Sequence, residues 1–163
     1  MITEKIPNFE SLDPTRQIEF VSDVAELLHH RQLVDGPANE LPCFHDPEFD
    51  QILNDPFDNR ELSALVDFLG SLVSDKNLET GIRSTASFAL GKTASLKALV
   101  KVVEAIKTRK LPPELLRQCA FAFDSLCDLS GADKVVPQSI ETDFVSAGLP
   151  WDKKASRLLI DEI

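Results

Sequence analysis

Carboxylates crowd one stretch of the chain, residues 40–61, and large aromatic side chains are interleaved with them. Paired acids can act as a general acid and a general base, but five acids within residues 46–58 make an acidic surface rather than two tuned groups. Apolar anchors inside a ring of charge are typical of an electrostatically steered protein interface. The acids expected to contact a partner, and the two phenylalanine anchors between them, are Asp46, Glu48, Phe49, Asp50, Asp55, Phe57 and Asp58.

The charge of the chain is confined to its first third. The formal net charge is −10, and residues 1–61 hold 14 acids and 4 bases, whereas residues 62–163 hold 13 of each. A negative field repels nucleic acid and anionic membranes and attracts basic surfaces. We therefore expect a basic protein as the partner, and neither nucleic acid nor a membrane.

One stretch imitates a nucleotide-binding loop. Residues 86–93 end in Gly91, Lys92 and Thr93, the same three residue types that end a phosphate-binding loop. That loop, however, needs glycine where Ala86 stands, and it must follow a strand. The surrounding residues have a helical pattern, so Gly91 is interpreted as a helix terminator. No G-x-S-x-G or H-E-x-x-H motif is present either. We expect no enzymatic activity.

The histidines and cysteines do not predict a metal site. Cys43 and His45 could share an ion, but no second pair with ligand spacing exists. His29 and His30 are adjacent on a predicted helix and point to different faces. Three cysteines without a C-x-x-C spacing also argue against a disulfide framework. We expect neither a metal nor any other cofactor.

The elements that position these residues are predicted to be helices. Asp13 and Pro14 are a good N-cap and first helical residue for a helix over 14–30. Residues 35–58 form an acidic loop punctuated by prolines, with one short helical turn near Phe49–Leu53. Asp152 caps a final helix over 152–162. No segment alternates with period two, so no sheet is expected.

A shift of 34 residues superimposes the apolar pattern of one helix pair on that of the next. Leu62 falls on Leu96, and Ala86 falls on Ala120, so the pairs 61–91 and 95–127 share one register. A lone pair cannot cover its own apolar face and has to stack on another. Arg83 falls on Arg117, and both are expected to bond the turns between helices.

The stretch 82–103 resembles the HEAT-like repeat of the bilin-lyase type. The matching residues are Ile82, Arg83, Ala86, Ala89, Leu90, Gly91, Leu96, Leu99 and Val103. The resemblance extends over two helix pairs in residues 61–129. It implies an all-α fold of stacked helical hairpins, an α-solenoid fragment, in a single domain 1–163. Helices 14–30 and 152–162 would then cap its ends.

Location and resemblance together suggest a function. Residues 1–20 have no continuous apolar run, and no window approaches the roughly 20 apolar residues of a membrane helix, so a cytoplasmic protein is expected. Small acidic HEAT-like proteins are similar to immunity proteins of bacterial contact-dependent or polymorphic toxin systems. This implies a monomer that occludes the active site of a basic nuclease toxin. Two alternatives remain: a generic HEAT-like adaptor using the concave face of helices 82–91 and 115–127, and a bilin-lyase-like ligand handler.

Overall fold

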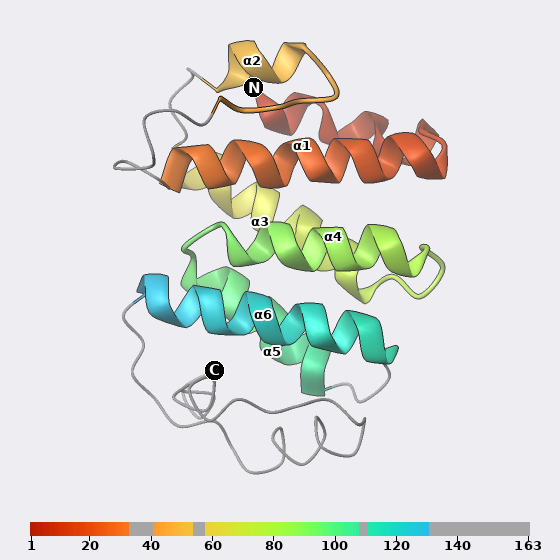
Figure 1. The fold of residues 1–163 in the computed structure, drawn as a ribbon, viewed down its shortest axis with the longest axis vertical. Coiled ribbons are helices and arrows are strands. Elements are labelled where there is room, and N and C mark those ends of the chain that lie inside the picture. Colours follow the sequence, from red (N-terminus) through yellow and green to blue (C-terminus); the bar gives the residue numbers. More distant parts are fainter. Residues whose placement is uncertain (33–40, 54–57, 108–110, 131–163) are drawn as a thin grey trace.

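All the regular structure in the described part of the chain is helical, as predicted. The computed structural model describes residues 1–32, 41–53, 58–107 and 111–130 (Figure 1). The elements are η1 (Ile2–Glu4), η2 (Ile6–Ser11), α1 (Pro14–Gln32), α2 (Glu48–Ile52), α3 (Asn59–Ser74), α4 (Thr80–Gly91), α5 (Leu96–Lys107) and α6 (Pro113–Ser130). The predicted helix 152–162 lies outside the described residues. None of the described helices is long and apolar enough to cross a membrane.

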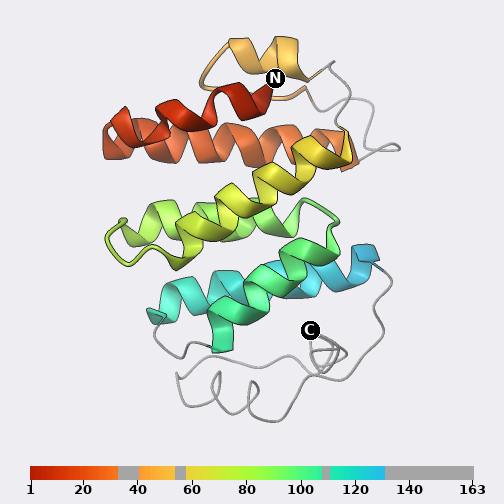
Figure 2. The same ribbon diagram turned by 180° about the vertical axis from the view of Figure 1, so that it is seen from behind.

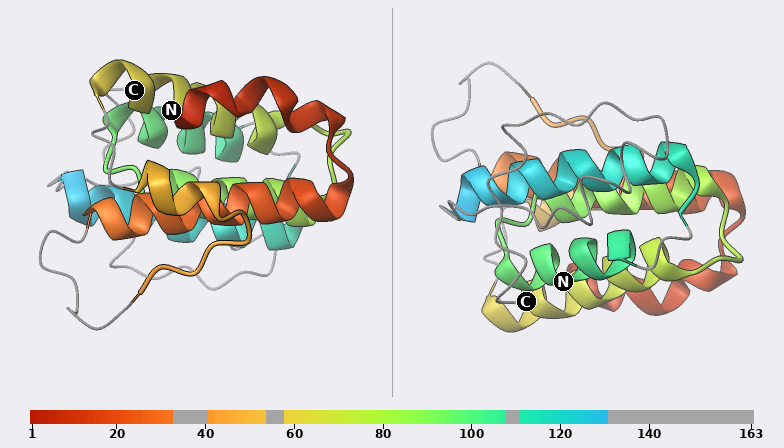
Figure 3. Two further views of the ribbon diagram at one scale, coloured as in Figure 1. Left: turned by 90° about the horizontal axis from the view of Figure 1, so that it is seen from above. Right: turned by 90° about the horizontal axis from the view of Figure 1, so that it is seen from below.

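The helices lie in two layers. Helices α1, α4 and α6 run side by side in one layer, and η2, α3 and α5 form the other, as the views from behind and from above and below show (Figures 2 and 3). Helix α4 packs against α1, α3 and α6, and α5 packs against α3 and α6. Helix α2 lies on the outer side of α1 at one end of the molecule (Figure 1). The apolar stripe of each helix is therefore covered by helices of both layers.

The starts of α1 and α3 are fixed by aspartate caps. The carboxylate of Asp13 accepts the backbone N–H of Arg16 at 3.0 Å, and Pro14 opens the helix without an N–H to satisfy. The carboxylate of Asp58 accepts the N–H of Glu61 at 2.7 Å. Each cap satisfies a backbone donor that the helix itself leaves unpaired.

Aromatic side chains join the N-terminal elements into the core. The ring of Phe9 in η2 lies 5.8 Å from that of Phe20 in α1 and 5.2 Å from that of Phe68 in α3. Edge-to-face pairs at such distances stabilise beyond the area they bury. Most of the other core residues are aliphatic, including Leu65 and Leu90, which are fully buried.

The α4–α6 seam is unusually close because small residues line it. A Cβ on Gly91 would lie 3.0 Å from the Cα of Ala122, and the Ser87 hydroxyl lies 3.4 Å from the Sγ of the buried Cys119. In the other layer, the Lys97 ammonium donates to the Ser63 hydroxyl at 2.7 Å. Ser63 and Lys97 are 34 residues apart and therefore stand at equivalent positions of the two helix pairs.

The two repeated arginines differ. The guanidinium Nε of Arg83 is buried and donates to the Val73 carbonyl at 3.0 Å, which bonds the end of α3 to α4 as predicted. Arg117 is exposed, so the second of the repeated arginines does not share the burial of the first, and its expected bond to a turn stays a prediction. The turn between α4 and α5 has one further special feature: Ala94 has a φ of 48°, the left-handed conformation that glycine prefers.

Candidate functional site

The acidic third of the sequence gathers at one end of the molecule. Residues 1–32, 41–53 and 58–61 contain eleven acids and four bases, which gives a net formal charge of −7. Residues 62–107 and 111–130 contain seven acids and seven bases. The backbone N–H of Ile2 donates to the Glu61 carboxylate at 3.1 Å, which brings the chain start to the start of α3. The charge asymmetry of the sequence is therefore also an asymmetry in space (Figure 1).

A buried carboxylate on α1 anchors the segment that carries α2, residues 41–53. Asp23 is 1% exposed and accepts the backbone N–H groups of His45 at 2.8 Å and Asp46 at 2.9 Å. The Nδ1 of His45 lies 2.9 Å from the same carboxylate. Two backbone N–H groups bonded to one buried carboxylate give the 41–53 segment a defined position on α1. No group of three or more metal-ligating side chains occurs in the described residues.

Two of the predicted contact residues are already paired within the chain. The Lys5 ammonium bonds the carboxylates of Asp46, at 3.0 Å, and Glu48. Burial opposes the charged form of Lys5, but the hydrogen bonds to Glu48 and Asp46 raise its pKa above the ordinary value. Partial burial also opposes ionisation of Asp46, but the Glu48 N–H and Lys5 hold its pKa below the usual range. Lys5 therefore neutralises part of the charge of this pair.

The predicted role of Phe49 as an anchor for the partner is wrong. Its side chain is 0% exposed and lies 5.9 Å from the Phe20 ring and 5.5 Å from the Phe44 ring. Helix α2 is amphipathic and turns Phe49 and Ile52 toward α1, because burying these apolar side chains lowers the free energy of the fold. Phe49 holds the acidic segment in place instead of contacting a partner.

The other predicted residues divide into two groups. Asp50 is exposed on α2 beside Glu48, whose side chain is 70% exposed. Asp58 is exposed at the start of α3, where it also serves as the helix cap. Asp55 and Phe57 lie outside the described residues. The structure thus brings Asp46 and Glu48 together at Lys5 and leaves Asp50 exposed elsewhere on α2.

A hollow of about 260 Å³ lies beside the Asp23–His45 contact. It adds Glu19 to the carboxylates of this end, and Arg16 is the one base on its lining. A cationic side chain of a partner would meet several acceptors there. Glu19 and Asp23 are four residues apart on α1, so they share a face. That spacing was a sequence signal for this site.

Exposed aromatic residues mark a second surface, on α4 and α6. Phe88 is 47% and Phe121 is 59% exposed, and the Lys92 ammonium lies 5.1 Å from the Phe88 ring centre. Ser87 and Ala122 face each other's helices across the seam. Because each helical residue turns by about 100°, Phe88 after Ser87 and Phe121 before Ala122 project from the same side of the layer. The two helices are those whose concave face was predicted for the adaptor alternative.

Comparison with protein-family models, curated proteins and solved structures finds no match to this chain. The charge, burial and contacts of the acidic end and of the Phe88–Phe121 surface are thus the observations on which function has to be argued.

Proposed function

We propose that this protein is a cytoplasmic, monomeric immunity protein that binds a basic nuclease toxin and occludes its active site. The observation that carries the proposal is the spatial asymmetry of charge: the acidic end has a net charge of −7, while the rest of the described chain is neutral. A nuclease active site is basic because it binds phosphates. A negative surface on a firm helical frame competes with the substrate for such a site.

Electrostatic steering is the mechanism of capture. Charges act over about 8 Å at physiological ionic strength, so several acids on one end attract a basic cleft before contact and raise the association rate. Glu48 and Asp50 are exposed on α2, which lies on the outer side of α1 (Figure 1). Asp46 and the hollow beside Asp23 supply further acceptors once contact is made.

The frame behind this end supports a HEAT-like assignment. The pairs α3–α4 and α5–α6 recur at the 34-residue shift, and α4 packs directly on α6. The two-layer arrangement, with the close Gly91–Ala122 approach, is the packing that such helix pairs need. A firm frame helps an inhibitor because binding then orders few additional groups.

Co-expression with a toxin domain tests the proposal. A basic nuclease toxin domain is expressed in a bacterial host, with and without this protein. The expected result is that cells survive only when both are made, and that the purified proteins associate at a rate that falls steeply with salt. Survival that does not depend on this protein would contradict the proposal.

Charge reversal locates the contact. Glu48→Lys with Asp50→Lys should weaken binding at least tenfold, about 1.4 kcal/mol or more. The matched control makes the same charge change on the neutral part of the chain: Glu104→Lys with Glu114→Lys, both exposed. Equal losses in the two variants would show that net charge, not the acidic end, governs binding.

A second candidate, an adaptor, is favoured by the exposed rings of Phe88 and Phe121. Exposed aromatic side chains are enriched where proteins bind partners. Phe88→Ser with Phe121→Ser should leave the unfolding free energy nearly unchanged, because the rings are half outside the core. If these substitutions abolish toxin binding and the α2 reversals do not, the contact lies on this face.

A further inference from the structure

A groove lies between the second 3-10 helix, η2, and α3. It has a volume of about 720 Å³ and lies between η2, the first turn of α1 and the C-terminal half of α3. This volume falls within the roughly 300–1,000 Å³ of sites that take a small ligand or a few side chains. The residues that define its character are Phe9, Phe68, Leu72, Leu78, Glu10 and Asp75.

The groove combines apolar side chains with polar groups, two of which are hydrogen-bonded within the protein. The Gln17 amide donates to the Phe9 carbonyl at 3.2 Å, and the Ser71 hydroxyl donates to the Phe68 carbonyl at 2.6 Å. An apolar group that enters can therefore contact the aromatic and aliphatic side chains without displacing either of these two hydrogen bonds. Burial against those side chains favours an apolar group in the occupant.

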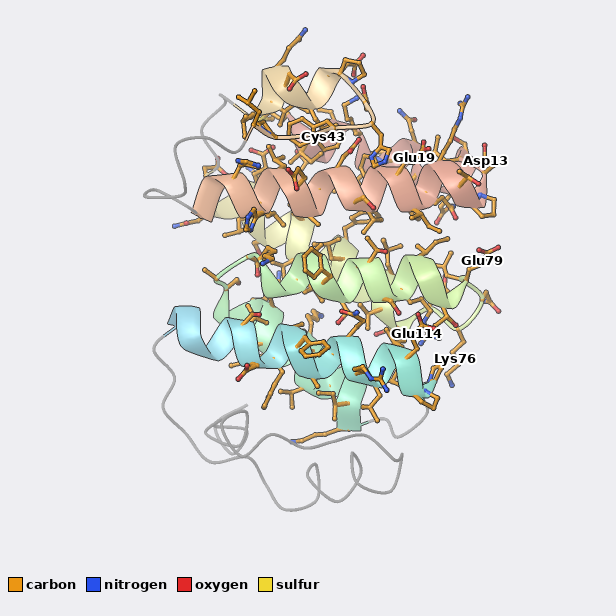
Figure 4. The ribbon with its side chains drawn as sticks, viewed as in Figure 1. Asp13, Glu19, Cys43, Lys76, Glu79 and Glu114 are labelled. Atoms are coloured by element: carbon orange, nitrogen blue, oxygen red, sulfur yellow. The ribbon has the colours of Figure 1, made fainter. Side chains whose placement is uncertain are left out.

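The rim of the groove is negative on both walls. Glu10 belongs to the η2 wall and Asp75 to the end of α3, and no lining residue is basic. Asp75 follows the last turn of α3, which has no basic residue, so the negative end of the helix dipole adds to its charge. Lys76 is exposed on the turn between α3 and α4 and does not line the groove (Figure 4).

We propose that the groove binds a short segment of the basic partner, in which one or two apolar side chains are flanked by lysine or arginine. Charge complementarity selects this occupant, because the two carboxylates disfavour an anionic lipid or an acidic peptide. The inference rests on the proposed function and adds a second contact, on α3, to the one at α2. The groove supplies the exposed apolar surface that the buried Phe49 does not.

A synthetic peptide tests the groove without the partner. The probe is a nine-residue lysine–leucine peptide, titrated into ¹⁵N-labelled protein and followed by amide chemical shifts. We expect saturable shifts at residues 6–10 and 68–78, and none with the peptide in which glutamate replaces lysine. Shifts confined to α2 or to the Phe88–Phe121 surface would overturn the assignment. So would groove shifts that grow with protein concentration alone, since a second copy would then be the occupant.

A pair of serine variants on α3 provides the matched control. Ser71 lines the groove and Ser74 does not, and both are exposed. Ser71→Arg should place a cation in the groove and weaken the peptide at least tenfold, whereas Ser74→Arg should stay within twofold of the wild type. Equal affinities for the two variants would overturn the proposal.

The co-expression assay separates the two proposals. Peptide binding in the groove of a protein that protects against no toxin would overturn the proposed function and leave the groove as a cationic-peptide site. Protection and toxin affinity that survive Ser71→Arg but not the α2 charge reversals would overturn the role of the groove and leave the proposed function standing.

Discussion

The attachment of the 41–53 segment to α1 and the seam between α4 and α6 hold their helices by different means. The segment is fixed by buried polar contacts to Asp23 and by the Lys5 ion pairs, with one aromatic side chain, Phe49, inserted. The seam is fixed by close approach, because Gly91 lies directly against Ala122.

This difference separates surface from frame. A contact that depends on hydrogen bonds to one carboxylate can be loosened by a change at that group, whereas interlocked helices resist local opening. We infer that the acidic end is attached to a frame that stays folded when the attachment is weakened.

The seam is expected to give the largest effect. In Gly91→Val, the added atoms meet the backbone of Ala122, which cannot move aside as a flexible side chain would. The unfolding free energy should fall by about 3 kcal/mol, the upper part of the range for overpacking, as measured by urea denaturation. Gly81→Ala is the control, because its Cβ meets only the Ile18 side chain at an ordinary 3.5 Å. If both variants unfold at the same urea concentration, the seam is not tightly packed.

Removing the buried anchor is expected to loosen the acidic segment and little else. Asp23→Ala leaves the N–H groups of His45 and Asp46 without their acceptor. Losing these hydrogen bonds to a carboxylate should cost about 2 kcal/mol locally. Hydrogen exchange should speed up at residues 45–46 and stay unchanged at residues 86–90 of α4. Equal acceleration in both places would mean that the segment and the frame open as one unit.

The ion pairs of Lys5 are expected to contribute less. Lys5→Met should cost about 1 kcal/mol or less, because Glu48 and Asp46 are largely open to solvent. The lowered pKa of Asp46 stabilises the fold above the ordinary carboxyl pKa, and this contribution is lost as pH falls through the lowered value. The raised pKa of Lys5 corresponds to a stabilisation that is fully present below the ordinary lysine pKa and is lost as pH rises through the raised value. A double-mutant cycle with Asp46→Asn, repeated across pH, measures the coupling.

The effect that is smallest at neutral pH concerns the thiol in the seam. Burial raises the pKa of Cys119 from 9.0 to about 11, although the Ser87 hydroxyl and Arg83 act in the opposite direction. The neutral thiol is therefore favoured in the fold, and stability should fall as pH rises from about 9 toward 11. At pH 8, peptide mapping after alkylation should find Cys43, which is exposed, modified well before Cys119. Equal labelling would show that the seam opens readily.

Much of the frame could be predicted from the sequence because its signals are local. The predicted start at Pro14 matches α1, the short turn near Phe49–Leu53 corresponds to α2, and Gly91 ends α4 as expected. N-caps, prolines and apolar spacing act within one or two turns. The 3-10 helices at the chain start were not predicted, although Ile2, Ile6 and Phe9 recur at spacings that fit helical turns.

The site was harder to predict because it depends on contacts between distant residues. The sequence indicated an acidic, apolar-studded segment but not which face of it would be buried, so Phe49 was assigned to the wrong side. Lys5 and Asp23 lie 41 and 22 residues from the groups that they bind. Nothing in a local pattern reveals such pairs. Arg83 and Arg117 occupy equivalent positions, yet only the first is buried, because neighbours and not register decide burial.

The backbone of Ala94 offers a practical consequence. A side chain in the left-handed conformation costs about 1–2 kcal/mol that glycine does not, so Ala94→Gly should raise the melting temperature of the whole protein. The position is remote in sequence from the acidic end and the groove and does not line either hollow. A sturdier parent of this kind would let the damaging seam and anchor substitutions be purified and compared as folded proteins.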